Sequence, residues 1–466
     1  MSEIVPLEAS GASAGSALVC KSVKRTLLGM AVPMLAGTFA MNAYHLTDTW
    51  FVSRLGTPAL AAMGFTFPIV MLLGCVAGGL GSAVTILASH AIGRRDHSAA
   101  AKIVTHGMAL TVMVSAIMSA AGYLGLEAVF RRLGADAAIL ALIGEYMRTW
   151  YAGAVFMFVP MMGNGILLSA GDSRMAARVM MLGPIINTVL DPVMIFGFAG
   201  FPAMGMKGAA LATVIAQAAS AFALVALLQK KHKLLVFKRG AFHGYSASVR
   251  KITAFGVPGI LTMILMPISA AVITRLLGGF GAEAVAAAGA AGRVEMFAFV
   301  IPMALGISLT PFVSQNYGAV RFDRIRTAKS FSMRFAAIYG GAVAVLFFLF
   351  APGIAAIFSN DPKVKEIIVS YIRIIPFGYG MMEIHRYCGF FLTGLHKPVH
   401  TTVLNAFRVL AVLLPLSWAG AHFFGIRGLF FGRLATDFIV GAAGLFWVHR
   451  VWKISARHAA HGTGTV

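Results

Sequence analysis

Four polar residues stand in otherwise apolar stretches of this chain, and their types suit ion binding: Asp48, Asn187, Asp191 and Thr213. Counted from the nearest turn glycines, Asp48, Asp191 and Thr213 lie six to eight residues inside the same boundary. At about 1.5 Å per helical residue, this depth is about 10 Å. Asn187 precedes Asp191 by four residues, so both side chains share one helix face. Together these residues predict an oxygen-rich site for a small hard cation or a shared proton.

Two more acids lie in apolar stretches of the second half of the chain. Glu295 follows Arg293 by two residues, and Glu383 precedes Arg386 by three. Each acid could contact a cation or a substrate. The alternative is a structural ion pair that joins one of the acids to the arginine beside the other. The sequence leaves both interpretations open.

Nothing in the sequence indicates an enzyme. The histidines in apolar stretches have no recurring ligand spacing, and the cysteines give neither a disulfide framework nor metal-ligand spacing; these residues are His45, His90, His385, Cys20, Cys75 and Cys388. No Gly-rich phosphate loop precedes a Lys and Ser/Thr pair, so ATP is not the expected energy source. We expect no cofactor.

The stretches that hold the polar residues are predicted to cross a membrane. Hydrophobic residues make up 59% of the chain and charged residues 12%, whereas a soluble globular protein carries about 25% charged residues. Apolar runs recur along the whole length, and a bilayer needs about 20 residues per helix, so we predict about twelve helical spans. They are 26–52, 58–90, 101–129, 137–168, 175–198, 206–229, 250–278, 284–316, 330–357, 365–394, 399–423 and 427–450.

The net charge of +22 would raise the question of nucleic acid in a soluble protein, but its distribution favours a membrane topology. Basic residues gather before the first predicted span and in every second loop: Lys21, Lys24, Arg25, Arg94, Arg95, Lys102, Arg174, Arg178, Lys230, Lys231, Lys233, Lys238, Arg239, Arg250, Lys251, Arg321, Arg324, Arg326, Lys329 and Lys397. The positive-inside rule places these loops and both termini in the cytoplasm. We see no removable signal peptide in residues 1–20 and expect a bacterial-type inner-membrane protein that binds no nucleic acid.

An internal repeat relates the two halves of the chain at an offset of 225 residues. Pro33, Gly56, Gly64, Gly81, Ser89 and Gly93 recur as Pro258, Gly281, Gly289, Gly306, Ser314 and Gly318. Six spans per half is an even number, so both halves start on the same side and should be related by an axis along the membrane normal. The acidic pair is unique to the first half, because Ile273 and Pro415 stand at the positions that match Asp48 and Asp191.

We therefore predict an all-α membrane protein with about twelve transmembrane helices in two pseudo-symmetric six-helix lobes. The predicted divisions are a cytoplasmic N-terminal segment (1–25), a first lobe (26–229), a basic cytoplasmic linker (230–249), a second lobe (250–450) and a cytoplasmic tail (451–466). Two such lobes can hold a substrate path between them and rock to alternate access.

Several short motifs resemble the multidrug and toxic compound extrusion (MATE) family. They are the run from Asp48 to Ala62 followed by Phe67-Pro68, and the runs Ser89 to Gly93, Asn187 to Pro192, Gly208 to Thr213 and Ser314 to Gly318. The similarity covers about residues 25 to 450. Two positions depart from the family pattern: His90 stands where a Gln is more common, and Thr393 stands where many members have an Arg.

The resemblance implies a twelve-helix antiporter that expels cationic, lipophilic compounds in exchange for H⁺ or Na⁺. It also implies that the cation site of the first lobe consists of Asp48, Asn187, Asp191 and Thr213, which would be metal ligands only if the ion is Na⁺. We expect a monomer whose partners are small cationic molecules and the lipid bilayer.

In the second lobe, the resemblance places Glu295 at a position that binds a cation in one branch of the family, and Glu383 next to the corresponding acid of the tenth span. A lipid-linked oligosaccharide flippase of related two-lobed architecture is the alternative. Such a flippase is expected to hold pyrophosphate with cationic residues in its central cavity, and Arg293 and Arg386 keep this alternative open. The exported compound and the choice between H⁺ and Na⁺ also stay open.

Overall fold

The computed structural model describes residues 18–198, 200–236 and 242–460, and these ranges are almost entirely helical and contain no strand. The first lobe contains α2 (Val23–Ser53), α3 (Thr57–Gly93), α4 (His97–Arg132), α5 (Ala137–Ala152), α6 (Ala154–Ser169), α7 (Ser173–Phe196), α8 (Gly205–Ala226) and the π-helix η1 (Leu227–Lys231). The second lobe contains α9 (Tyr245–Gly278), α10 (Ala282–Ala298), α11 (Val300–Gly318), α12 (Phe322–Phe358), α13 (Pro362–Ile374), the 3-10 helix η2 (Ile375–Gly378), α14 (Tyr379–Gly394), α15 (Pro398–Ala406), the π-helix η3 (Phe407–Leu413) and α16 (Leu414–Ala460). The predicted all-α class is confirmed.

These helices account for the twelve predicted spans. Two of the spans are bent pairs, with an angle of 55° between α5 and α6 and of 54° between α10 and α11. The run Pro398–Ile454 holds two spans, because the backbone of Gly425 is not helical (φ 65°, ψ −155°). The chain folds back there, since a Cβ added to Gly420 would meet the backbone of Gly428. Helix α12 and the final span extend beyond their predicted ends.

The bend between α10 and α11 has a cause in the sequence. Pro302 has no N–H, so it cannot bond the carbonyl of Ala298 four residues earlier. The Tyr339 hydroxyl from α12 donates a hydrogen bond of 2.8 Å to that free carbonyl. The Tyr387 hydroxyl from α14 donates to the carbonyl of Pro302 itself at 2.9 Å. The proline therefore bends the span without leaving the Ala298 carbonyl unpaired.

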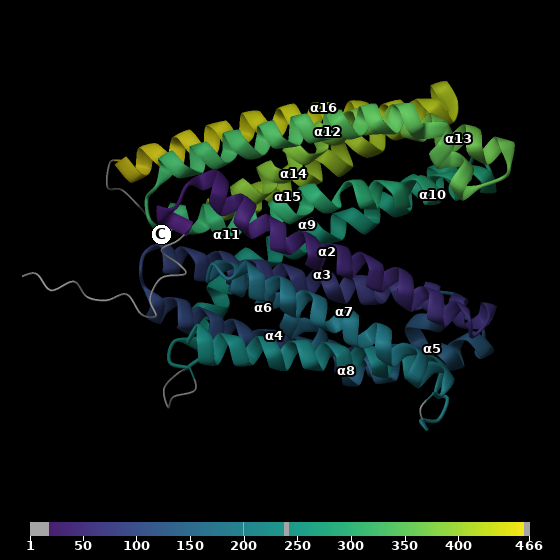
Figure 1. Cartoon of the computed structure of the whole chain (residues 1–466), viewed down its shortest axis with the longest axis horizontal. Helices are drawn as coiled ribbons and strands as arrows, with labels where there is room; N and C mark the ends of the chain where they lie inside the picture. The colour runs from purple at the N-terminus through teal and green to yellow at the C-terminus, as the bar shows by residue number, and fades with distance from the viewer. Residues whose placement is uncertain (1–17, 199, 237–241, 461–466) are drawn as a thin grey trace, which may run out of the picture.

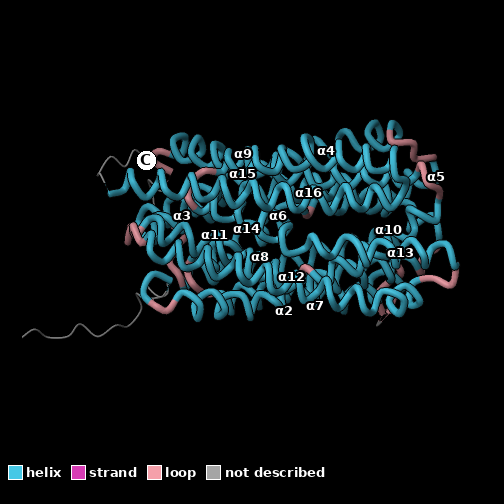
Figure 2. Tube along the Cα trace, turned by 90° about the horizontal axis from the view of Figure 1, so that it is seen from above, coloured by secondary structure: helices cyan, strands magenta, loops and turns pink. Residues whose placement is uncertain are grey.

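The two lobes lie side by side along their length. Figure 1 shows α4, α5 and α8 along one side of the molecule and α12, α14 and α16 along the other, with α2, α3, α9 and α11 between them. Within the lobes, α7 packs on α2 and α8, and α14 packs on α12 and α16. Between the lobes, α3 packs on α9 and α11, and α2 packs on α11. Figure 2 shows the same helices running along the long axis of the molecule.

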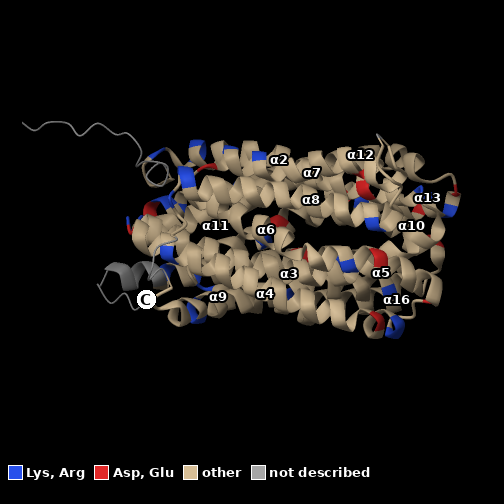
Figure 3. Cartoon of the chain, turned by 90° about the horizontal axis from the view of Figure 1, so that it is seen from below, with Lys and Arg blue, Asp and Glu red and all other residues tan. Residues whose placement is uncertain are grey.

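Charge distinguishes the two ends of the bundle. The loops after α3, α6, α8, α11 and α14 lie at the end where the C-terminus is drawn, and most charged segments there are Lys or Arg (Figure 3). We call this end the basic end. Acidic and basic segments are mixed at the opposite end. This agrees with the alternation of loop charge in the sequence. The predicted N-terminal segment, linker and tail lie partly outside the described residues. Lys238 and Arg239 of the linker lie outside them.

The repeated motif closes the basic end. A Cβ added to Gly93 would collide with the α11 backbone, and one added to Gly318 would collide with the α3 backbone. The Ser314 hydroxyl donates a hydrogen bond of 2.8 Å across the interface to the carbonyl of Ile86. Gly93, Gly318 and Ser314, which belong to the repeat, therefore bring the basic ends of α3 and α11 into direct contact.

Candidate functional site

The four polar residues predicted in the first lobe lie on three helices that pack on one another. Asp48 is on α2, Asn187 and Asp191 are on α7, and Thr213 is on α8. All four are buried, with exposed fractions of 7% for Asp48 and 0% for Asp191. The Asn187 side-chain amide donates a hydrogen bond of 2.5 Å to Oδ2 of Asp191. The shared helix face predicted for the last two residues is therefore present.

Each of the two acids keeps an oxygen without a hydrogen-bond partner. These atoms are Oδ1 of Asp48 and Oδ1 of Asp191. Neither acid forms an ion pair within the described part of the chain, but the two carboxylates repel each other. A buried charge without a partner is costly. The arrangement therefore favours taking up a proton or a small cation.

Two hydroxyl groups border this acidic pair. The Tyr44 hydroxyl lies 3.5 Å from the Thr213 hydroxyl, which connects α2 to α8. The Thr213 hydroxyl also donates to the Ala209 carbonyl at 3.1 Å, so its lone pairs face away from its own helix backbone. Hydroxyl, amide and carboxylate oxygens are ligands that suit a hard cation, and the same carboxylates can carry a proton.

The acids of the second lobe are paired differently from the sequence hypothesis. Glu295 on α10 pairs with Arg433 on α16 and not with Arg386. The Tyr371 hydroxyl donates to the other oxygen of Glu295 at 2.5 Å, and Arg433 donates to the Tyr371 oxygen at 2.6 Å. This ring of three side chains satisfies Glu295. The suggested pair of Glu295 with Arg386 is wrong, because Arg433 of α16 takes the place beside Glu295 and Arg386 lies beside Glu383.

Glu383 also has a partner other than the predicted Arg293. Nη1 of Arg386, one turn along α14, lies 2.9 Å from Oε1 of Glu383. This contact lacks hydrogen-bond geometry, since both Glu383 oxygens are without a hydrogen-bond partner. Arg293 itself is exposed and forms no ion pair within the described residues. The predicted Glu383–Arg293 pair is therefore wrong.

Sequence reasoning missed three members of this second cluster, namely Arg408, Arg433 and Asp437. Nη2 of Arg408 lies 3.8 Å from Oδ1 of Asp437, which is fully buried. All three residues stand inside the last two predicted spans, where any charge is unusual. Arg433 and Asp437 are also four residues apart and share a helix face. Those two features could have marked them as candidate site residues, although not their partners.

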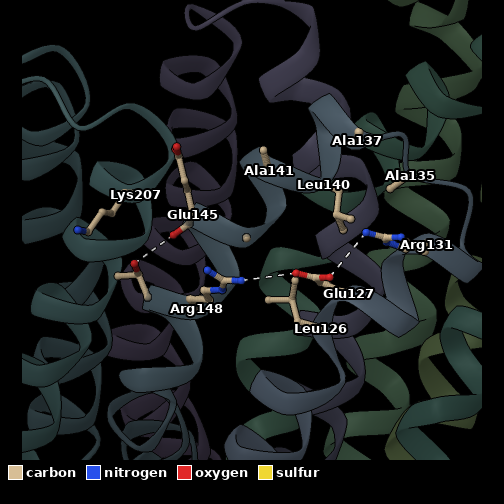
Figure 4. Close-up of a pocket in the computed structure, with 12 residues that line it drawn as sticks. Leu126, Glu127, Arg131, Ala135, Ala137, Leu140, Ala141, Glu145, Arg148 and Lys207 are labelled. Carbon is tan, nitrogen blue, oxygen red and sulfur yellow. Dashed lines mark hydrogen bonds and ion pairs between the residues drawn. The ribbon is translucent and has the colours of Figure 1, made fainter.

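A surface pocket of about 760 Å³ lies apart from both clusters. It is lined by residues of α4 and α5, the loop between them and Lys207 of α8 (Figure 4). This loop lies at the end of the first lobe that is opposite the basic end. Glu127 lies 3.7 Å from Arg131 and 3.8 Å from Arg148, and all three side chains are more than half exposed. None of the predicted site residues lines it. No group of three or more His, Cys, Asp and Glu side chains that could hold a metal occurs in the described ranges.

A two-lobed bundle of twelve spans with buried charges in each lobe is an architecture typical of membrane transporters. The MatE family model matches residues 33–193 and 258–419, once in each lobe, and the two matches begin 225 residues apart. The chain belongs to the MatE family of multidrug and toxic compound extrusion transporters. The match also confirms the internal repeat.

Individual relatives agree with this assignment. A protein of Shewanella oneidensis named FAD transporter is 34% identical over 436 residues, which cover 93% of this chain and 96% of that protein. A probable multidrug resistance protein NorM of Agrobacterium fabrum is 27% identical over 90% of both chains. The crystal structure of the Vibrio cholerae MATE transporter VcmN in the bent form superposes with a TM-score of 0.88 at 28% identity, over 95% of this chain and 99% of that one.

Proposed function

We propose that this transporter is an antiporter that exports small molecules by alternating access in exchange for H⁺ or Na⁺. The observation that carries the proposal is the pair of buried acids, Asp48 and Asp191, each with a free oxygen and neither with an ion-pair partner in the described residues. Such a pair changes its affinity for an ion whenever its exposure to water changes. Asn187 and Thr213 would complete the ion site.

The proposed location is the inner membrane of a bacterial-type cell, with the basic end in the cytoplasm. The positive-inside rule supports this orientation, because the loops at the basic end carry most of the excess positive charge. Both termini would then be cytoplasmic. One chain holds both lobes and the interface between them, which supports a monomer as the working unit.

Two substrate classes have support. Cationic, lipophilic compounds are favoured by the multidrug names of several relatives and by the acids of the first lobe. FAD, an anionic dinucleotide, is favoured by the name of the relative that is 34% identical. The arginines of the second lobe would offset the negative charge of such a substrate. We propose FAD as the second candidate on this ground.

A reconstitution experiment tests the proposal. The protein is inserted into liposomes loaded with either a lipophilic cation, tetraphenylphosphonium, or FAD. A Na⁺ gradient and a pH gradient are imposed in separate runs, and release is followed against protein-free liposomes. We expect one of the gradients to drive release. Absence of gradient-driven release of both probes would overturn the antiporter proposal, and the responding gradient identifies the coupling ion.

A further inference from the structure

We propose that the arginines inside the second lobe form a binding site for the phosphate or pyrophosphate group of an anionic substrate, with Arg386 and Arg408 as the binding residues. The inference rests on the proposed export function and assigns a substrate class to a particular place in the second lobe. The cluster also contains the acids Glu383 and Asp437, which lie behind the two guanidinium groups.

The two arginines are partly exposed, whereas their acidic partners are buried. The side chains of Arg386 and Arg408 are 24% and 15% exposed, and those of Glu383 and Asp437 are 1% and 0% exposed. The guanidinium groups are therefore the part of the cluster that a ligand can reach, whereas the carboxylates are covered. The acids keep the cluster close to neutral when no ligand is bound.

The hydrogen-bonding capacity of both arginines is largely unused. Arg386 and Glu383 lie 2.9 Å apart without forming a hydrogen bond, and the only hydrogen bond of Arg386 within the described residues is a long one of 3.9 Å to the sulfur of Met303. Nε of Arg408 is buried without any partner, and its contact with Asp437 is 3.8 Å. A phosphate group presents oxygens that match a guanidinium fork in pairs, so it would supply the missing acceptors.

The third arginine of the cluster serves a different purpose. Arg433 is bound to Glu295 and Tyr371 in a closed ring and has its acceptors in place. It stands four residues before Asp437 on α16, so it adds positive charge to the same helix face. Arg433 is therefore a supporting charge, whereas Arg386 and Arg408 have free donors.

Local backbone structure and depth also fit a binding site. Arg408 lies in the π-helix η3 (Phe407–Leu413), and π-helical turns within longer helices occur frequently at functional sites. Arg386 is held in place by the ring of Phe299, whose centroid lies 4.9 Å from the guanidinium carbon. Arg433 and Asp437 follow the turn at Gly425 by eight and twelve residues, so the cluster lies about 12 to 18 Å from the opposite end, close to the bilayer centre.

A pyrophosphate group could belong to a soluble dinucleotide or to a lipid-linked sugar carrier. The shared chemistry is the pair of phosphates, which guanidinium groups bind in either molecule. The relative named FAD transporter favours the soluble dinucleotide. The experiment therefore includes both sources.

Binding is measured on the full chain in nanodiscs, with the anisotropy of flavin fluorescence as the signal. FAD is titrated against wild type, Arg386→Gln, Arg408→Gln and Arg408→Lys. Riboflavin, which has the same ring system and no phosphate, serves as the matched probe. Arg427→Gln is the control variant, because Arg427 is 64% exposed and pairs with Glu366 outside the cluster. Inorganic pyrophosphate and undecaprenyl pyrophosphate are added as competitors to the wild type.

We expect each Gln variant to bind FAD about tenfold more weakly, since a charge-assisted hydrogen bond is lost. Arg408→Lys should also bind more weakly, because an ammonium group cannot make the paired contact. The arginine variants should bind riboflavin as the wild type does, and Arg427→Gln should bind FAD with wild-type affinity. Inorganic pyrophosphate should displace FAD from the wild type. The wild-type competition needs no variant, so it remains decisive if a variant misfolds.

Two results would overturn the inference while leaving the antiporter proposal intact. One is gradient-driven export of tetraphenylphosphonium by a wild type that binds neither FAD nor pyrophosphate. The other is equal FAD affinity in all the arginine variants. Displacement of FAD by undecaprenyl pyrophosphate at far lower concentration than by inorganic pyrophosphate would support the anion site but overturn the soluble dinucleotide as its occupant.

Discussion

The amide of Asn187 donates a hydrogen bond of 2.5 Å to Oδ2 of Asp191, and Oδ1 of the same carboxylate has no partner in the described structure. Because the Asn187 amide already occupies Oδ2, Oδ1 is the oxygen left available to take up a proton or a cation. Oδ1 of Asp48 is likewise free. The hydrogen bond from Asn187 therefore sets the orientation of Asp191 before the ion arrives.

Replacing either acid by Asn should abolish coupling. Asp191→Asn and Asp48→Asn keep the size of the side chain but remove the charge that responds to the ion. We expect gradient-driven release from proteoliposomes to fall by about tenfold or more, with the protein still inserted and folded. Initial rates at several ion concentrations provide the measurement.

Asp136→Asn is the matched control for these two variants. Asp136 caps the exposed start of α5 by accepting a hydrogen bond of 2.8 Å from the backbone of Ile139, and Asn caps a helix as well as Asp does. Glu383→Gln should cost less than either first-lobe variant. Wild-type rates and ion dependence in both Asn variants would place the coupling site elsewhere, with Glu295 as the next residue to test.

The pair of Glu295 with Arg433 should matter for stability. In Glu295→Gln, Arg433 would lose its charged partner in a site where its side chain is only 18% exposed. We expect a loss of about 2 to 3 kcal/mol in the free energy of unfolding. The double variant Glu295→Gln with Arg433→Gln should recover part of that loss.

Thermal unfolding in detergent measures this effect. Glu283→Gln is the comparison, because Glu283 forms an exposed pair with Lys363 at 3.4 Å, and such pairs contribute little. Equal unfolding temperatures for the Glu295 and Glu283 variants would contradict a stabilising role of the ring with Tyr371.

Sequence alone predicted the parts of this fold that depend on local or repeated patterns. Apolar length predicted the spans, loop charge predicted the difference between the two ends, and the glycine repeat predicted two equivalent lobes. The i, i+4 spacing predicted the hydrogen-bonded pair Asn187 and Asp191. Each of these features is fixed by helix geometry or by the bilayer.

Contacts across the second lobe could not be predicted in the same way. The partner of Glu295 depends on how α16 folds back at Gly425 and brings Arg433 to Glu295, which no spacing within one helix reveals. The bend at Phe299 follows from Pro302, but the sequence did not reveal that Tyr339 would pair with the freed carbonyl. Tertiary packing decided both partners, and the role of the first-lobe acids in ion coupling remains a prediction.

A charge cluster at the basic end should make the stability of the fold depend on pH in the acidic range. Lys231 donates a hydrogen bond of 2.6 Å to Asp172, which also accepts from the backbone of Met175 at the start of α7. Burial raises the pKa of Asp172, but the hydrogen bond and charge of Lys231 lower it by more, so that the pKa lies below its ordinary value. A carboxyl group with a lowered pKa stabilises the fold above its ordinary pKa of about 4, and this contribution is lost as the pH falls through the lower, folded-state value.

Asp172→Asn should reveal this dependence. The variant keeps the helix cap but loses the ion pair, so wild type should be the more stable protein at pH 7. The difference in unfolding temperature should shrink as the pH falls from about 5 to about 2. A difference that stays constant over this range would show that the charge of Asp172 is not the cause of the lost stability.

Reporter fusions test the orientation of the bundle. A reporter placed after residue 240 should be cytoplasmic, and one placed after residue 362 should be external, because an odd number of spans lies between them. Alkaline phosphatase, which is active only outside the cytoplasm, and green fluorescent protein, which is fluorescent inside it, give opposite signals. Both reporters on one side of the membrane would contradict the twelve-span topology.

Closure of the basic end should depend on the absence of a side chain at Gly93 and Gly318. A Cβ on either residue would collide with backbone of the other lobe, which cannot move aside as a flexible side chain can. Gly93→Ala and Gly318→Ala should therefore push the lobes apart at this end and slow transport, because one of the two alternating states is destabilised. Gly64→Ala is the control, since nothing lies within 4 Å of a Cβ added there.

The distance between the lobes can be measured with spin labels on cysteines placed at Lys102 and Arg326, both exposed near the basic end, in a background without the three native cysteines. Pulsed electron resonance should show a longer distance in Gly93→Ala and Gly318→Ala than in the parent and in Gly64→Ala. The same two variants should transport more slowly, whatever the substrate, because the collision lies in the closing interface and not in a binding site. An unchanged distance together with slow transport would instead place the defect in packing within one lobe.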